Sequence, residues 1–176
     1  MKKPVNFLVI IVISTNFALA MTRPPLWPVI IGTGFGSGFC PIAPGTAGAV
    51  LATLIWVALS YAMPSAILIA VTAVLIVVST AAGTWAAGKL APYWGDDPSK
   101  VVIDEMAGVW VPLLAAPTGN LWWPLACFAL FRFFDILKPL GIRALDQRKG
   151  PFWVMADDLA AGLYSLVIIL LAQWAI

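Results

Sequence analysis

The chain has 176 residues, of which 62% are hydrophobic and only 10% are charged. Soluble domains are about 45–50% apolar, so this composition predicts a membrane protein, and the length predicts a single domain. A net charge of +2 from scattered basic residues is too weak for a nucleic-acid interface, and a chain without histidine gives its two cysteines no partners for a zinc site.

The first twenty residues have the features of a secretory signal peptide. They combine two lysines at the start, a short apolar core and Ala18-Leu19-Ala20 before an expected cleavage point. Met21 offers another start of translation, and the same segment is also consistent with a short membrane anchor. We therefore expect residues 1–20 to be a signal peptide, leader or added anchor, and residues 21–176 to be the membrane domain.

A glycine-rich block follows at about residues 27–40, with glycine at positions 32, 34, 36 and 38. The run matches neither the GxGxxG fingerprint nor a P-loop. Its backbone amides can face a phosphate, or its small residues can allow close helix packing. The block is too short for a confident span, so a helix and a re-entrant segment are equally consistent with it.

Five further apolar blocks lie at about 47–62, 65–88, 101–116, 121–137 and 159–176. They are continuously apolar, whereas the strands of a membrane barrel alternate apolar and polar residues. The sequence therefore predicts an all-α fold, a compact polytopic membrane helix bundle with a glycine-rich, helical or re-entrant N-terminal segment.

The connections between these blocks differ in charge. Residues 88–100 and 138–158 carry lysines, arginines and aspartates, whereas 61–65 and 117–120 carry no charged residue. Basic loops stay on the cytoplasmic side of a membrane. This rule predicts that 47–62, 101–116 and 159–176 run outward and that 65–88 and 121–137 run inward.

The predicted topology brings carboxylates to the cytoplasmic side. Asp104 and Glu105 lie near the start of one helix, Asp135 near the end of the next, and Asp157 and Asp158 at the start of the last. Ionisable groups at membrane depth are costly and usually mark function. Carboxylates this close raise one another's pKa unless cations neutralise them, and Mg²⁺ prefers such oxygen ligands.

Two cations flank Asp135 on the same helix. Arg132 precedes it by three residues and Lys138 follows it by three. Carboxylates, divalent metal and Arg or Lys together suit a phosphate substrate. A structural alternative remains open, in which Asp157 and Asp158 are favourable charges at a helix start and Arg132 forms an i,i+3 ion pair.

Other phosphatase chemistries lack their residues in this chain. Without histidine there is no phosphohistidine intermediate, and Cys127 and Arg132 form Cys-x4-Arg, one residue shorter than the loop of cysteine phosphatases. No Asp-x-Asp nucleophile motif occurs. The aspartates are therefore interpreted as metal ligands.

Four segments, in this order and at these separations, resemble the phosphatidylglycerophosphatase A family over about residues 27–170. They are GFGSGFCPIAPGTAG, VVIDEMAGVW, FRFFDILKPLGIRALD and MADDLAAG. The resemblance implies a bacterial inner-membrane enzyme that uses Mg²⁺ to hydrolyse phosphatidylglycerophosphate to phosphatidylglycerol and phosphate. The family's Lys-Pro-x-Pro reads Lys138-Pro139-Leu140-Gly141 here, and residues 1–20 have no counterpart in the family pattern.

With this resemblance the expected site is complete. We expect the catalytic and metal-binding residues to be Asp104, Glu105, Asp135, Asp157 and Asp158. We expect the substrate phosphate to be bound by Arg132, Lys138, Ser37, Gly45 and Thr46, the last two from the motif that begins at Pro44. The partners are the lipid substrate and the bilayer, with the active site facing the cytoplasm.

Two alternatives remain at this stage. Another headgroup phosphatase or transferase would use similar residues, although the Asp-Gly…Ala-Arg…Gly…Asp…Asp motif of the CDP-alcohol enzymes is absent. A small transporter would place acids near mid-membrane and show an internal repeat, and neither feature is found. The sequence has no signal for oligomeric state.

Overall fold

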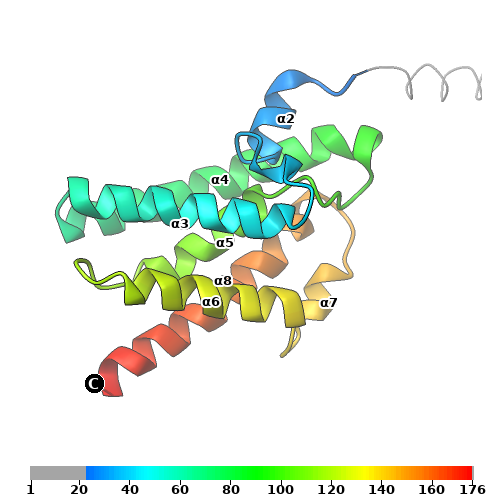
Figure 1. Cartoon of the computed structure of the whole chain (residues 1–176). Coiled ribbons are helices and arrows are strands. Elements are labelled where there is room, and N and C mark those ends of the chain that lie inside the picture. Colours follow the sequence, from blue (N-terminus) through cyan, green and yellow to red (C-terminus); the bar gives the residue numbers. More distant parts are fainter. Residues whose placement is uncertain (1–22, 176) are drawn as a thin grey trace, which may run out of the picture.

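The computed structural model describes residues 23–175, and over this range it is built from helices without strands (Figure 1). The elements are α2 (Leu26–Gly32), the 3-10 helix η1 (Ser37–Phe39), α3 (Pro44–Ala62), α4 (Ser65–Trp94), α5 (Ile103–Leu113), α6 (Trp122–Leu137), α7 (Ile142–Asp146) and α8 (Pro151–Ala175). The predicted all-α bundle is confirmed. The leader expected at residues 1–20 lies outside the described residues.

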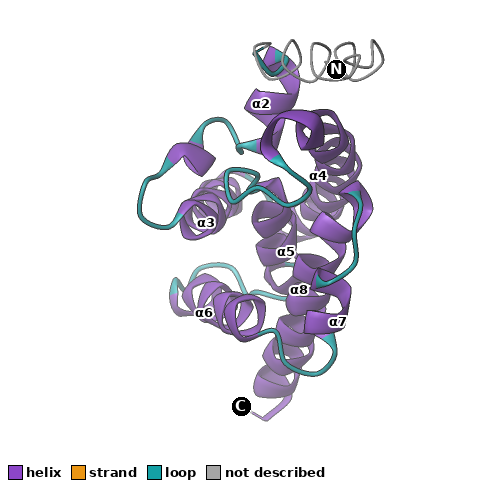
Figure 2. Ribbon diagram, turned by 90° about the vertical axis from the view of Figure 1, so that its right-hand side faces the viewer, coloured by secondary structure: helices purple, strands orange, loops and turns teal. Residues whose placement is uncertain are grey.

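The central element is α5, which lies between α3, α4, α6 and α8 (Figures 1 and 2). Ten of its eleven residues are buried. Its apolar sequence is therefore explained by contact with protein, whereas the sequence alone had suggested a membrane span. Eleven helical residues rise only about 16 Å, about half the thickness of a hydrocarbon core, so the expectation that 101–116 forms a complete span is wrong.

Within residues 23–175, three helices are long and apolar enough to cross a membrane, namely α3, α4 and α8. Large apolar side chains cover the outward face of α4, where Val74, Val77 and Val78 are more than half exposed. Such exposure is costly in water and favourable in lipid. The lengths and faces of these helices thus agree with a polytopic membrane protein.

The connections separate into two ends of the bundle (Figure 1). At the uncharged end, the α3–α4 turn meets the α5–α6 loop, and Ser65 Oγ lies 3.2 Å from Thr118 Oγ1. Gln173, near the end of α8, donates to the carbonyl oxygen of Ala115 at the same end. The opposite, charged end contains the loops at 95–102 and 138–150.

The last helix begins eight residues earlier than the apolar block predicts. Pro151 occupies its first position, where the missing N–H costs nothing and the fixed φ suits a helix. Asp157 and Asp158 consequently lie almost two turns inside α8, which corrects their expected position at the helix start. They are buried there, so they are not simple first-turn charges that favour the helix dipole.

Glycines bring α5 and α8 into backbone contact. A Cβ added at Gly162 of α8 would overlap the carbonyl oxygen of Gly108 in α5. A Cβ at Gly108 would lie 2.8 Å from the carbonyl oxygen of Asp158. Small residues permit this close approach in membrane bundles, and the approach places the acids of α8 next to those of α5.

Candidate active site

A cavity of about 200 Å³ opens at the charged end, where α5, α6 and α8 converge. We call it the acidic cavity. The charged residues in its lining are Asp97, Asp104, Glu105, Asp135, Lys138, Asp157 and Asp158. The structure thus gathers all five carboxylates that the sequence singled out, from three different helices, although their individual roles stay predictions.

Three of these carboxylates form the tightest group. Asp104, Glu105 and Asp158 each place one oxygen within 4.8 Å of the others. Asp104 and Asp158 are only 6% and 4% exposed, and Glu105 Oε2 is buried without a hydrogen-bond partner. Buried like charges with an unsatisfied oxygen are unfavourable unless a cation joins them. The group therefore fits a divalent cation with oxygen ligands.

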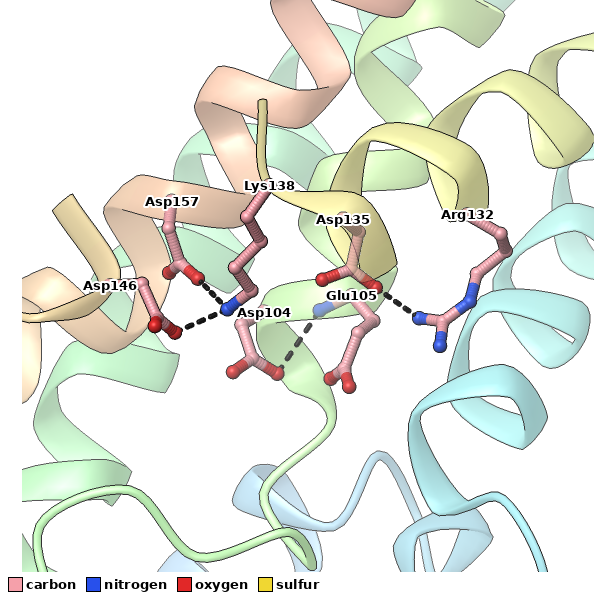
Figure 3. A network of polar contacts seen from close by, with 7 residues as sticks. All are labelled: Asp104, Glu105, Arg132, Asp135, Lys138, Asp146 and Asp157. Atoms are coloured by element: carbon pink, nitrogen blue, oxygen red, sulfur yellow. Dashed lines mark hydrogen bonds and ion pairs between the residues drawn. The ribbon is translucent and has the colours of Figure 1, made fainter. Parts of the chain in front are cut away.

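The first turn of α5 holds two members of this group. The backbone N–H of Glu105 donates to Asp104 Oδ1 at 3.0 Å, which fixes one carboxylate against the helix start (Figure 3). Unpaired N–H groups at a helix start also stabilise negative charge. The same turn lies next to α3, whose residue Gly45 faces the Glu105 carboxylate.

Gly45 is the point at which the first sequence motif reaches the site. A Cβ added there would overlap Glu105 Oε1 and would lie 3.4 Å from Arg132 Nη1. Only glycine leaves room for the carboxylate in its present position. Gly45 therefore leaves the space that Glu105 occupies, which gives a physical reason for the glycine in the PGT sequence.

Arg132 is engaged with Asp135. Its Nη1 donates to Asp135 Oδ2 at 2.5 Å, so the i,i+3 ion pair considered from the sequence is present (Figure 3). Arg132 Nε is buried and has no hydrogen-bond partner. The guanidinium thus retains one unused donor, and Arg132 does not itself line the acidic cavity.

Lys138 bridges two aspartates from different helices. Its Nζ donates to Asp157 Oδ2 at 2.6 Å and also to Asp146 Oδ1 (Figure 3). Burial acts to lower the pKa of Lys138, but the two hydrogen bonds outweigh it and raise the pKa above its usual value. Lys138 is therefore charged and neutralises Asp157, which leaves that carboxylate less available than the three grouped ones.

The turn after α6 sets the direction of this lysine. Lys138 ends α6 in the left-handed conformation, with φ 45° and ψ 51°. Gly141 has φ 89°, also left-handed. Proline fixes φ near −65°, so the glycine that replaces the second proline of the family pattern allows a turn that proline would prevent.

Sequence reasoning missed Asp146 and Asp97. Asp146 is the last residue of α7 and bonds to Lys138. It could have been found from the sequence, because it is the final residue of the FRFFDILKPLGIRALD segment. Asp97 lines the acidic cavity from the loop after α4. The sequence indicated Asp97 less clearly than Asp146, because two consecutive aspartates in a charged loop are typical of an ordinary protein surface.

Two expected phosphate ligands lie elsewhere in the described chain. Ser37 Oγ is within hydrogen-bonding distance of the carbonyl oxygens of Thr33 and Gly34, so it stabilises its own turn. Thr46 is half-buried in the first turn of α3. Neither residue lines the acidic cavity. Their part in binding phosphate stays a prediction, whereas Gly45 is in contact with the site.

A polytopic bundle with a carboxylate-lined cavity at one end is suited to an integral-membrane enzyme with a charged substrate. A family model described as phosphatidylglycerophosphatase A matches residues 30–173, and the chain belongs to this family. The protein is accordingly an enzyme that hydrolyses a phosphoric monoester.

Similar proteins extend over nearly the whole chain. A protein of Bacteroides thetaiotaomicron, provisionally named a phosphatidylinositol-3-phosphatase, is 56% identical over 89% of this chain and 99% of its own length. The phosphatidylglycerophosphatase A of Haemophilus influenzae is 36% identical, over 82% of this chain and 88% of its own. The phosphatidylglycerophosphatase A of Escherichia coli is 33% identical, over 86% of this chain and 84% of its own. No solved structure matches the chain significantly.

Proposed function

We propose that the protein hydrolyses phosphatidylglycerophosphate to phosphatidylglycerol and phosphate with Mg²⁺ as cofactor. The observation that carries this proposal is the group formed by Asp104, Glu105 and Asp158, whose oxygens lie within 4.8 Å of one another. Glu105 Oε2, buried without a partner, supports it further. Family membership supports the lipid substrate.

The three grouped carboxylates would hold Mg²⁺, with Asp135 and Asp157 next to them in the cavity. Mg²⁺, when bound, supplies Lewis-acid activation of the phosphoester and of the attacking water. Arg132 would bind a phosphate oxygen through its guanidinium, which Asp135 orients. Lys138, which lines the acidic cavity and is paired with Asp157, is the second cation that would bind the phosphate.

We place the active site at the cytoplasmic face of the bacterial inner membrane. The acidic cavity lies at the charged end, which the distribution of basic loops assigns to the cytoplasm. A headgroup then enters from the interface while the acyl chains stay among the apolar faces of α3, α4 and α8. This arrangement lets a small bundle act on a lipid without extracting it from the bilayer.

A second candidate substrate is a phosphoinositide. It is favoured by the name of the Bacteroides thetaiotaomicron protein, which shares 56% of its residues with this chain. Both candidates are lipids that end in a phosphate monoester, so the same carboxylates would serve either one. The transporter considered from the sequence is excluded because the family is one of enzymes.

The deciding experiment uses the purified protein in detergent with Mg²⁺ or with a chelator. Phosphate release is measured from phosphatidylglycerophosphate, phosphatidylinositol 3-phosphate and phosphatidic acid. We expect release from phosphatidylglycerophosphate to be fastest and to stop when Mg²⁺ is removed. Faster release from the inositol lipid would favour the second candidate, equal rates would indicate a general lipid phosphatase, and no Mg²⁺ dependence would contradict the metal assignment.

A further inference from the structure

A second cavity, of about 180 Å³, adjoins the acidic cavity on the side of α7 and the start of α8. Asp97, Val154 and Asp157 line both cavities. The two spaces are therefore neighbours separated by shared side chains, and one extended headgroup can occupy both. We call the second space the headgroup cavity.

The chemistry of the headgroup cavity differs from that of the acidic cavity. Its lining adds Gln147, Arg148 and Trp153, none of which belongs to the carboxylate group. The Arg148 guanidinium lies 4.3 Å from the centre of the Trp153 ring, which orients the arginine across an aromatic face. Arg148 forms no ion pair with any acid in the described part of the chain. Its donors are thus available to a ligand.

The charge of this lining opposes a second phosphate. Four aspartates line the headgroup cavity, namely Asp96, Asp97, Asp146 and Asp157, against the two cations Arg148 and Lys149. Hydroxyl groups suit the same lining, because a hydroxyl donates to carboxylates and accepts from guanidinium or amide N–H groups. Trp153 and Val154 add apolar surface for the carbon atoms that carry those hydroxyls.

The wall between the two cavities is held by the Lys138 bridge. Lys138 bonds to Asp157, which lines both cavities, and to Asp146, which lines only the headgroup cavity. A ligand phosphate in the acidic cavity and its hydroxyl-bearing neighbour in the headgroup cavity would therefore lie on opposite sides of Asp157, which Lys138 holds in place. This gives the substrate a defined direction.

We propose that the headgroup cavity binds the hydroxyl-bearing spacer of the lipid headgroup, with Gln147 and Arg148 as the residues that select it. The inference rests on the proposed function, because it assumes that the terminal phosphate occupies the acidic cavity. It goes beyond that function by assigning substrate selection to residues of the α7–α8 connection, which take no part in holding the metal.

The test compares phosphatidylglycerophosphate with an analogue in which propane-1,3-diol replaces the bridging glycerol and the free hydroxyl is lost. We expect the unmodified protein to prefer the natural lipid about tenfold in kcat/KM, the effect of one hydrogen bond to a charged group. Gln147→Ala and Arg148→Ala should each lose most of this preference, chiefly through a higher KM for the hydroxylated lipid. Rates with the analogue should stay within about twofold of the unmodified protein.

Arg143→Ala is the matched control. Like Arg148, Arg143 is an exposed cation, but it lies in α7 and does not line the headgroup cavity, so its loss should leave the preference intact. Gln147 and Arg148 are exposed as well, and thermal unfolding in detergent should be unchanged in all three variants.

Two results would overturn the inference alone. One is an unmodified protein that cleaves both lipids equally well, and the other is a preference that survives both Gln147→Ala and Arg148→Ala. A protein that releases no phosphate from phosphatidylglycerophosphate in the presence of Mg²⁺ would instead overturn the proposed function, and the inference with it.

Discussion

Asp104 is a buried carboxylate beside two others, so its charge is tolerable chiefly when a cation is bound. Asp104→Asn keeps the size of the side chain and removes that charge. We expect at least about a hundredfold loss of phosphate release. Without Mg²⁺, thermal unfolding should occur at the same or a higher temperature, because the repulsion among the three carboxylates is relieved.

This pair of measurements separates a ligand from a structural acid. If Asp104→Asn lowers the unfolding temperature of the metal-free protein, the carboxylate is stabilising without a cation. If the variant releases phosphate at a near-normal rate, Asp104 is not a ligand of the catalytic metal.

Gly45 offers a test in which the fold is preserved and one carboxylate is moved. In Gly45→Ala the added methyl group would overlap Glu105 Oε1, the far end of a flexible side chain that can turn away. We expect turnover to fall about tenfold or more, since displacements of about 1 Å at a reacting centre are costly. The unfolding temperature should change little.

The control is Gly88→Ala, another glycine inside a helix. A Cβ at Gly88 would meet only Pro151, at 3.1 Å, and Gly88 does not line the acidic cavity. This variant should keep its turnover. Normal activity of Gly45→Ala would show that Glu105 does not need its present position.

Among the elements, α8 depends on its glycine contact with α5. The side chain of Gly162→Ala would overlap a backbone carbonyl, that of Gly108, so the helices must separate. We expect a loss of about 1–3 kcal/mol in the free energy of unfolding, the usual cost of overpacking. Turnover should fall as well, because Asp158 moves away from Asp104 and Glu105.

Leu163→Ala is the control on the same helix. Leu163 is 57% exposed on the outer surface. Its truncation should therefore change turnover and the packing against α5 less than Gly162→Ala does. If Gly162→Ala unfolds like the unmodified protein in denaturant, the backbone contact between α5 and α8 is not a stabilising one.

The junction of α6, α7 and α8 depends on a single lysine. Lys138→Met leaves Asp146 and Asp157 without their shared cation, whereas Asp146→Asn removes only one of the two charged contacts. A hydrogen bond to a charged group contributes about 1.5–3 kcal/mol. We therefore expect Lys138→Met to lower the unfolding temperature more than Asp146→Asn does. The reverse order, measured in the same detergent, would contradict the bridge.

For the whole molecule, the separation of charge predicts its orientation. Single cysteines are introduced as Asn120→Cys at the uncharged end and Arg143→Cys at the charged end, after replacement of Cys40 and Cys127 by serine and alanine. In intact cells stripped of the outer membrane, an impermeant maleimide should label position 120 and reach position 143 only after permeabilisation. The opposite pattern would place the acidic cavity outside the cytoplasm.

Much of the molecule follows from local properties of the sequence. Continuous apolar blocks predict that α3, α4 and α6 are helices, because a backbone surrounded by lipid or apolar side chains satisfies its polar groups best within a helix. The charges of the connecting loops likewise separate the charged end from the uncharged end. Since both signals are contained in short segments, they need no knowledge of which helix packs against which.

Relations between distant segments required the tertiary structure. The sequence indicated which carboxylates lie near one end, but helix crossing decided that Asp104, Glu105 and Asp158 form the tight group and that α5 is enclosed by protein. Side-chain geometry decided that Lys138 bonds to Asp146 and Asp157. The sequence by itself determined that the chain forms apolar helices and that charged residues lie near one end of them. Backbone contacts through glycine, such as that of Gly108 with Gly162, determined which of these charged residues become neighbours.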